Sequence, residues 1–204
     1  VPGETVNYYG VAVGVVVMFV VGLIDDLKDL KAKQKLVGQI IAACFVAGSG
    51  LLLADIRDPF GEGFIHFGLW AYPLTVFYLV AFANIINLID GLDGLAAGIT
   101  AISAACMFVF SFLSGRTDAA ILCVIVVGVC VGFLTKNINP ASIFMGDSGA
   151  LTLGFGLGII SLFAVERSAL VLSLVVPILA AGVPIIDTAF AIIRRKSQHK
   201  RIDE

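Results

Sequence analysis

Long runs of apolar residues dominate the sequence, and short polar segments separate them. A helix needs about 17–25 apolar residues to cross a hydrocarbon core about 30 Å thick. The run at 150–164 is short and rich in Gly, and the run at 169–193 is interrupted by Pro177 and Pro184. Strands that alternate apolar and polar residues, as in membrane barrels, are absent. The pattern therefore predicts an all-α polytopic membrane protein with seven helices, at residues 8–24, 36–54, 70–89, 95–113, 119–135, 150–164 and 169–193.

Basic residues fall unevenly on the two sides that these spans would separate. Because the connections are short, the chain must change sides at each one, and the side richer in Lys and Arg is cytoplasmic. Ten of the 13 Lys and Arg residues lie in the first and fifth connections and after the last span. We therefore expect an outside N-terminus and cytoplasmic segments at 25–35, 90–94, 136–149 and 194–204.

Composition supports a chain surrounded by lipid and excludes other classes. Apolar residues make up 59% of the 204 positions and charged residues only 14%, against about 25% charged in soluble domains. The net charge of −2 excludes a nucleic-acid binder, and four Cys residues do not form a disulfide scaffold. The sequence starts without Met and stops in a charged segment, so we expect one membrane domain, 1–204, incomplete at both ends.

The acidic residues gather on the side expected to be cytoplasmic. Carboxylates close to a membrane are costly, and those that persist usually have a function. Solvation in a loop would explain any one of them, but it explains poorly a cluster on one face in Gly-bearing loops. The pattern predicts a functional site that includes Asp25, Asp26, Asp90, Asp93, Asp147 and, near the cytoplasmic end of the last span, Asp187.

The first of these polar segments, 22–35, combines two adjacent carboxylates with four Lys residues. Lys28 and Lys35 are seven positions apart, which would place them on one face of a helix. Carboxylates can bind a divalent cation or accept a proton, and Lys can neutralise phosphate. A basic cluster that only fixes topology would explain the Lys residues but not Asp25 and Asp26. The segment therefore predicts a site for phosphate and a divalent cation.

The second segment, 84–98, carries two Asp–Gly pairs at Asp90 and Asp93. Such pairs predict a tight reversal that exposes backbone N–H groups and points two carboxylates into one cavity. Asn84, Asn87 and Asp90 recur every three residues, which places three polar groups on one flank of the span's end. A plain turn would need only one Asp–Gly pair, so the segment favours a binding site.

The third segment, 136–156, places Asp147 before a Gly-rich helix start. Free N–H groups and the positive end of the helix dipole suit phosphate with a bridging Mg²⁺. Phe144 offers an aromatic plane that could stack on a base, although an interfacial anchor is the commoner role for such a residue.

Together the motifs resemble the polyprenyl-phosphate N-acetylhexosamine-1-phosphate transferase family. The resemblance rests on DD…K…Q, NxxNLxDGLDGLAAG, NxxPAxxFMGDSGxLxLG and VPxxDTxFAIxRR, which extend from Asp25 to Arg195. It implies that the phosphate of a polyprenyl carrier such as undecaprenyl phosphate attacks the β-phosphorus of a UDP-sugar and releases UMP. It also implies Mg²⁺, with Mn²⁺ as a substitute, and an active site on the cytoplasmic face of a bacterial plasma membrane. Family members have about three further N-terminal spans.

The resemblance also implies roles for single residues. Asp147 would be the metal ligand, with Asp25, Asp26 and Asp90 lining the same centre. Either Asp25 or Asp26 would deprotonate or orient the carrier phosphate. Lys35 would contact phosphate.

Further positions correspond to substrate-binding residues of the family. Lys28 would be a second phosphate contact. Asp93 and Phe144 match the positions that hydrogen-bond and stack uracil, and Asn137 matches an Asn of the nucleotide pocket. Active-site support is the expected role of two other residues, Asn87 and Asp187.

The expected donor is UDP-N-acetylglucosamine, as in enzymes of Gram-positive wall-polymer (teichoic acid) synthesis. The lipid I translocase usually has Thr where Ile89 stands, so the phospho-MurNAc-pentapeptide translocase of peptidoglycan synthesis is the alternative. The family's His-rich segment beyond the RR pair has no match here, because His199 does not fit it. A homodimer is an open expectation.

Two other classes share part of the pattern. An ion-coupled transporter would place acids near the bilayer midplane and show repeated halves, whereas these acids lie at one face and no repeat is evident. A catalytically inactive scaffold would carry the same motifs, so only an activity measurement separates it from an enzyme.

Overall fold

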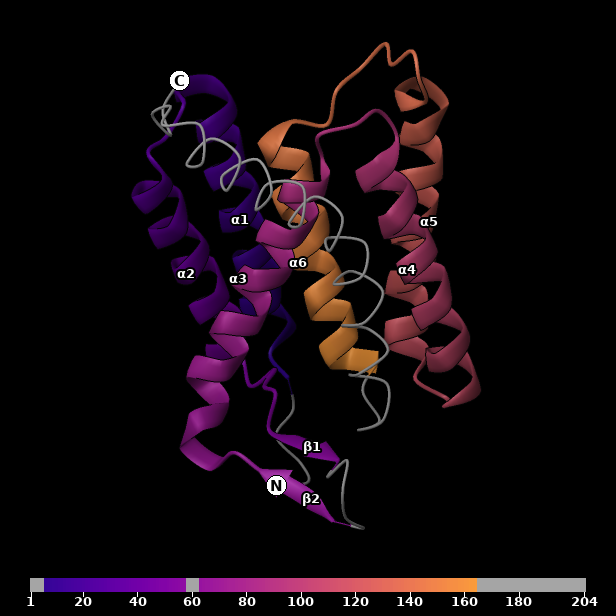
Figure 1. The fold of residues 1–204 in the computed structure, drawn as a ribbon. Helices are drawn as coiled ribbons and strands as arrows, with labels where there is room; N and C mark the ends of the chain where they lie inside the picture. The colour runs from indigo at the N-terminus through magenta and orange to yellow at the C-terminus, as the bar shows by residue number, and fades with distance from the viewer. Residues whose placement is uncertain (1–5, 58–62, 165–204) are drawn as a thin grey trace, which may run out of the picture.

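The computed structural model describes residues 6–57 and 63–164, and its helices lie side by side in one bundle (Figure 1). Each of the first six predicted spans contains an α-helix, although the helix in the second ends six residues before the predicted boundary at 54. The seventh predicted span, 169–193, and with it Asp187, lies outside the described residues. In chain order the helices are α1 (Tyr8–Lys28), α2 (Ala32–Gly48), α3 (Ala71–Ile89), α4 (Leu95–Leu113), α5 (Thr117–Asn137) and α6 (Gly146–Ala164).

The lengths and surfaces of the helices fit a lipid environment. Among the described residues, five helices are long and apolar enough to cross a membrane. The exception is α2, whose 17 residues are near the lower limit of about 17 for a bilayer core. Large apolar side chains such as Phe77, Phe112 and Val16 are exposed on the outside of the bundle. The chain is therefore an all-α polytopic membrane protein.

Helix α6 is the most buried of these five helices, and it packs against both α1 and α3. Two glycines one turn apart face α3. A Cβ on Gly154 would lie 2.5 Å from the carbonyl oxygen of Phe82, and one on Gly158 would lie 3.1 Å from a methyl group of Leu79. Small residues at this spacing let two membrane helices approach closely. The Gly content that weakens the sixth run as a sequence signal is thus what allows α6 to fill the centre.

The connection between α2 and α3 departs from the sequence prediction. The apolar run predicts a span at 36–54, but α2 begins at Ala32 and ends at Gly48. Gly50 follows with φ +88°, a left-handed conformation that ends the helix and that glycine adopts without strain. The chain then forms an antiparallel hairpin of β1 (Asp55–Arg57) and β2 (Phe64–His66), followed by η1 (Gly68–Trp70).

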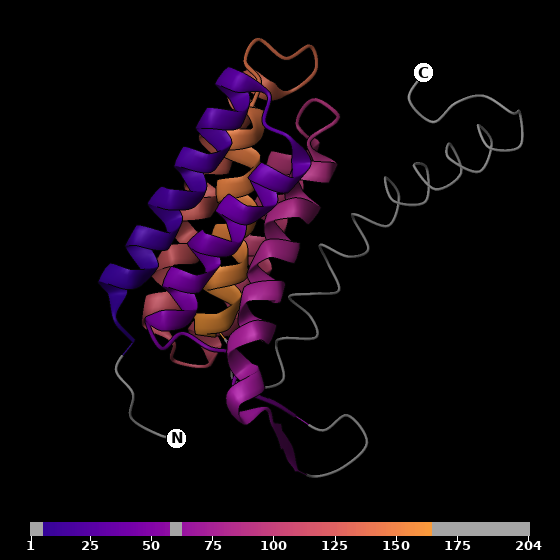
Figure 2. The same ribbon diagram turned by 90° about the vertical axis from the view of Figure 1, so that its left-hand side faces the viewer.

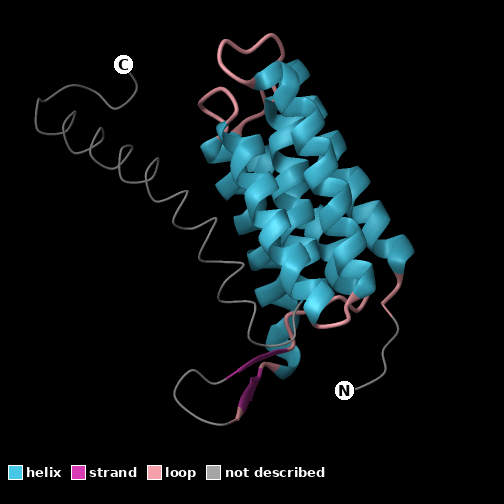
Figure 3. Ribbon diagram, turned by 90° about the vertical axis from the view of Figure 1, so that its right-hand side faces the viewer, coloured by secondary structure: helices cyan, strands magenta, loops and turns pink. Residues whose placement is uncertain are grey.

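The hairpin lies at one end of the bundle, and the loops that carry the acidic motifs lie at the other (Figures 2 and 3). The helices α1 and α3 end near these loops, and α2 and α6 begin there. The bundle thus brings four helix ends together from segments far apart in the sequence.

Candidate active site

A partly buried Lys connects the four helix ends opposite the hairpin. The Nζ atom of Lys35 lies 2.8 Å from Oδ2 of Asp25 and 2.7 Å from Oδ2 of Asp147, and it donates to Oδ1 of Asn87 at 3.3 Å. The side-chain amide of Asn87 donates in turn to Oδ1 of Asp147. These four residues come from α2, α1, α6 and α3 respectively, and we call them the Lys35 cluster.

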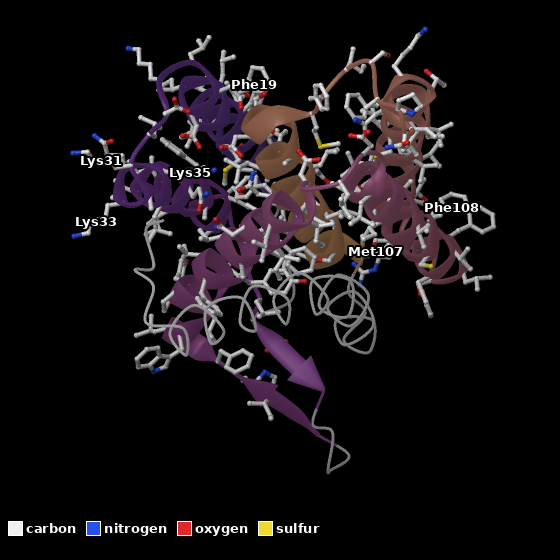
Figure 4. The ribbon with its side chains drawn as sticks, turned by 45° about the horizontal axis from the view of Figure 1, so that its top comes forward. Phe19, Lys31, Lys33, Lys35, Met107 and Phe108 are labelled. Carbon is white, nitrogen blue, oxygen red and sulfur yellow. The ribbon has the colours of Figure 1, made fainter. Side chains whose placement is uncertain are left out.

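Burial separates Lys35 from the other Lys residues of its segment. Its side chain is 16% exposed and that of Asp25 is 8% exposed. Lys31 and Lys33 extend away from the bundle, whereas Lys35 lies between helices (Figure 4). Removing one partner of such a salt bridge destabilises the fold, because the other partner is left as an uncompensated charge.

The predicted common helical face of Lys28 and Lys35 is wrong. Helix α1 ends at Lys28, and Asp29 adopts a left-handed conformation with φ 48°. A new helix then begins at Ala32. The break turns Lys35 into the bundle and leaves Lys28 exposed at the end of α1.

The two adjacent carboxylates have different partners. Asp25 pairs with Lys35, and its Oδ1 also accepts the backbone N–H of Leu30 at 2.8 Å. Asp26 caps the start of α6, because Oδ1 accepts the N–H of Asp147 at 2.7 Å and Oδ2 accepts the N–H of Ser148 at 3.0 Å. The sequence predicts free N–H groups at this helix start, and the structure shows that two of them, at Asp147 and Ser148, are bonded to Asp26.

A cavity of about 420 Å³ adjoins the Lys35 cluster. It brings together seven residues predicted from the sequence. Phe144 is 78% exposed at the cavity. The predicted residues that line it are Asp26, Asn87, Asp90, Asp93, Asn137, Phe144 and Asp147.

Hydrogen bonds join the two loops around this cavity. Oδ2 of Asp93 accepts the side-chain amide of Asn139 and the backbone N–H of Ala141, both at 3.1 Å. Asn137 is buried, and its Oδ1 accepts the N–H of Gly94 at 3.0 Å while its Nδ2 donates to the carbonyl of Ile143 at 2.9 Å. Both residues thus hold the 90–94 loop against the 138–146 loop and fix the shape of the cavity.

An amide pair between α2 and α3 lies next to the Lys35 cluster, and the sequence did not predict that its two residues are partners. Nδ2 of Asn84 donates to Oε1 of Gln39 at 2.6 Å, and Nε2 of Gln39 donates back to Oδ1 of Asn84 at 3.3 Å. Gln39 lies one turn beyond Lys35 on α2, and Asn84 lies about one turn before Asn87 on α3. The pair therefore fixes the register of α2 against α3. The spacing of these polar residues was the signal in the sequence, but it did not identify the partners.

Asp90 follows the last residue of α3. Among the groups outside the helices, it has the pKa that the surroundings shift most clearly. Burial, together with the negative charges of Asp147 and Asp26, raises the pKa of Asp90 to about 6. Three carboxylates therefore crowd one wall of the cavity at neutral pH. Such crowding opposes folding, and it is common where a site is built to bind a cation or a proton.

We expect Asp90→Asn to stabilise the folded protein at pH 8 and to give no gain at pH 4. Because the folded-state pKa lies above the usual value, ionisation of Asp90 costs stability as the pH rises from about 4 to about 6. The gain should be about 1 kcal/mol, because solvent screens a partly exposed group. Thermal unfolding in detergent with a chelator measures it. Asp29→Asn, at an exposed carboxylate, is the control, and an equal shift for both variants at both pH values would contradict the assignment.

A Lys–carboxylate cluster thus lies beside a carboxylate-lined cavity at one end of a membrane bundle, an arrangement common in sites that bind a cation or a proton. The comparison with known families agrees: the model of glycosyl transferase family 4 matches residues 8–165. The chain belongs to this family. The resemblance noted in the sequence motifs is thereby confirmed.

Individual relatives give the same result. The chain is 42% identical over 185 residues to the probable undecaprenyl-phosphate N-acetylglucosaminyl 1-phosphate transferase of Bacillus subtilis, an alignment that covers 91% of this chain and 52% of that protein. It is 33% identical over 216 residues to the phospho-N-acetylmuramoyl-pentapeptide-transferase of Chloroherpeton thalassium, covering 91% and 57%. A protein of that name from Desulforamulus reducens is 40% identical over 176 residues, covering 74% and 52%. The chain spans about half the length of these curated relatives.

Proposed function

We propose that the complete protein transfers N-acetylglucosamine 1-phosphate from UDP-N-acetylglucosamine to undecaprenyl phosphate and releases UMP. The observation that carries this proposal is the Lys35 cluster, in which one partly buried ammonium group stands between two carboxylates beside a cavity lined by further carboxylates. Phosphoryl transfer depends mainly on positioning and charge neutralisation rather than on a covalent protein intermediate. The cluster supplies both.

The proposed reaction is a displacement at phosphorus. An oxygen of the carrier phosphate forms a bond to the β-phosphorus of the UDP-sugar. The bond between that phosphorus and the bridging oxygen breaks, and UMP leaves with this oxygen. The sugar keeps its bond to the transferred phosphate, so the product is a polyprenyl-diphosphate sugar.

Residues of this chain have distinct parts in the proposed reaction. Lys35 neutralises phosphate charge, and Asp25 and Asn87 hold its ammonium group in place. The uracil would lie against Phe144, which is exposed at the cavity, with Asp93 at the same wall. The orientation of the carrier phosphate falls to Asp25 or Asp26, and each of these carboxylates has both oxygens engaged by other groups of the protein.

A divalent cation fits the carboxylates of the cavity. Mg²⁺ is usually held by one or two carboxylates together with substrate phosphates and water. Within residues 6–57 and 63–164 no three His, Cys, Asp or Glu side chains lie close enough to hold a metal ion by themselves, so substrate phosphates and water would have to complete its coordination. Asp147 would hold Mg²⁺ with Asp90 beside it, and the ion would stabilise negative charge on the diphosphate.

Placement at the cytoplasmic face of a bacterial plasma membrane completes the proposal. Lys28, Lys31 and Lys33 are exposed at the same end of the bundle as the cavity, as expected for a cytoplasmic end. A lipid phosphate at headgroup depth and a soluble nucleotide could meet there. No carboxylate in the described helices lies near a helix centre, which speaks against an ion-coupled transporter.

We expect the complete protein to release UMP from UDP-N-acetylglucosamine when undecaprenyl phosphate and Mg²⁺ are present. Removal of Mg²⁺ with a chelator should stop the release, and Mg²⁺ or Mn²⁺ should restore it. UMP is measured by chromatography, with heat-treated protein as the control. UDP-N-acetylmuramoyl-pentapeptide is the second donor, because several relatives carry the corresponding name. UMP from the second donor alone would overturn the proposed donor, and no UMP from either would overturn the transferase.

A further inference from the structure

Helix α1 touches the first turn of α6 at Gly22, directly beside the Lys35 cluster. A Cβ on Gly22 would lie 2.5 Å from the Cα of Ser148, 2.7 Å from its backbone nitrogen and 2.7 Å from the carbonyl oxygen of Asp147. All three atoms belong to the backbone, so no side-chain rotation could relieve the contact. Ordinary carbon contacts are about 3.5–4.0 Å. Any side chain at position 22 must therefore move α6 by about 1 Å.

The contact between α1 and the start of α6 is also close at Asp26. Asp26, one turn further along α1, holds the N–H groups of Asp147 and Ser148. Gly146, the first residue of α6, has φ +67°, and a Cβ there would lie 2.9 Å from both carboxylate oxygens of Asp26. Gly22 and Gly146 thus let the Asp26 carboxylate and the start of α6 come together. This contact between α1 and α6 holds Asp147 in the Lys35 cluster.

We infer that Gly22 is a positioning residue, which sets the depth at which the first turn of α6 rests on α1 and so places Asp147 against Lys35. This inference rests on the proposed function, because it gives the placement of Asp147 a catalytic consequence. The side chain of Gly22 is a hydrogen atom and contacts no substrate. Its effect passes through the backbone of residues 147 and 148.

A second glycine of the same helix separates this role from general packing. A Cβ on Gly14 would lie 2.6 Å from a methyl group of Val46 and 2.8 Å from the carbonyl oxygen of Ala42. Gly14 is therefore also tightly packed, but against α2 and about two turns away from Gly22 along α1. Gly132 on α5 has no heavy atom within 4 Å of its Cβ position and serves as an open control.

The test compares Gly22→Ala, Gly14→Ala and Gly132→Ala in the complete protein. We expect kcat for UMP release to fall about 100-fold in Gly22→Ala, as a displacement of about 1 Å at a reacting group can cause. Gly14→Ala should also lower the thermal unfolding temperature but keep kcat within about threefold of wild type, because its contacts lie away from the site. Gly132→Ala should leave kcat unchanged and should not lower the unfolding temperature, because Ala fits the open space there and favours the helix.

Hydrogen exchange provides a readout that does not need activity. In Gly22→Ala the N–H groups of Asp147 and Ser148 should lose their bonds to Asp26 and exchange faster, whereas in Gly14→Ala they should exchange as in wild type. The positioning role would be overturned if these amides exchanged in Gly22→Ala at the wild-type rate. It would also be overturned if Gly22→Ala and Gly14→Ala lost kcat equally. If wild type itself releases no UMP, the proposed function fails, and exchange alone still decides whether Gly22 holds the start of α6.

Discussion

Asp147→Asn is expected to lower the rate of UMP release by about three orders of magnitude, similar to the loss of a main electrostatic contact in other enzymes. Asp147 accepts bonds from Lys35 and from Asn87 and lies beside Asp90 in the cavity wall. Asn keeps the shape but removes the negative charge. The cluster then loses a partner for Lys35 and the carboxylate that we propose as ligand of the divalent cation. The rate is measured with saturating donor and carrier over a series of Mg²⁺ concentrations.

The structure offers a matched control for this variant. Asp118 is also an acidic residue in the first turn of its helix, α5, but it lies at the hairpin end of the bundle and accepts a hydrogen bond from Tyr8. Asp118→Asn makes the same chemical change away from the cavity, so it should leave kcat close to wild type. Near-normal turnover of Asp147→Asn, or equal losses in both variants, would show that the metal and the phosphates bind elsewhere.

The second large effect is expected for Lys35→Met, which keeps the length of the side chain and removes its charge. Asp25 and Asp147 would then face each other without the shared cation, so the folded protein should lose about 3 kcal/mol of stability. The transferred phosphate would also lose its ammonium partner, and turnover should fall by about 10²–10³-fold. Thermal unfolding and UMP release measure the two effects.

Two further Lys variants make the second prediction specific. Lys33→Met removes an exposed Lys that extends away from the bundle, and it should change neither stability nor rate. Lys35→Arg keeps the charge but presents a planar group in place of a point charge, so it should recover stability better than rate. If Lys35→Met were as active as wild type, Lys35 would be a structural residue only.

Much of the site is visible in the sequence because the carboxylates are rare in an apolar chain. The Asp residues of the first three motifs stand out as a cluster, and all of those motifs meet at one end of the bundle. Prediction from the sequence fails where an apolar or polar pattern continues past the point at which a helix ends. Position 29 is such a break, since the turn there separates Lys28 from Lys35. The end of α2 at Gly48 is another, since apolar residues 51–54 continue the pattern after the helix has ended.

Partners across the bundle are equally invisible in the sequence. Adjacent acids such as Asp25 and Asp26 have the same chemistry in isolation, and no spacing rule tells which one pairs with Lys35 and which one caps α6. The amide pair of Gln39 and Asn84 joins two segments 45 positions apart. Such choices depend on how helices rotate and approach one another, which the contacts at glycines such as Gly22 control.

The sequence by itself determined the membrane class, the number and order of the first six helices, the family and the set of acidic residues, because hydrophobic length and rare charges are local properties. Only the tertiary structure decided which carboxylate has which partner. It placed Lys35 between Asp25 and Asp147 and assigned Asp26 to the start of α6. It also made Gly22 the contact that sets the distance between α1 and the first turn of α6. These distinctions require distances between four helices, and distances of that kind arise only when the helices pack.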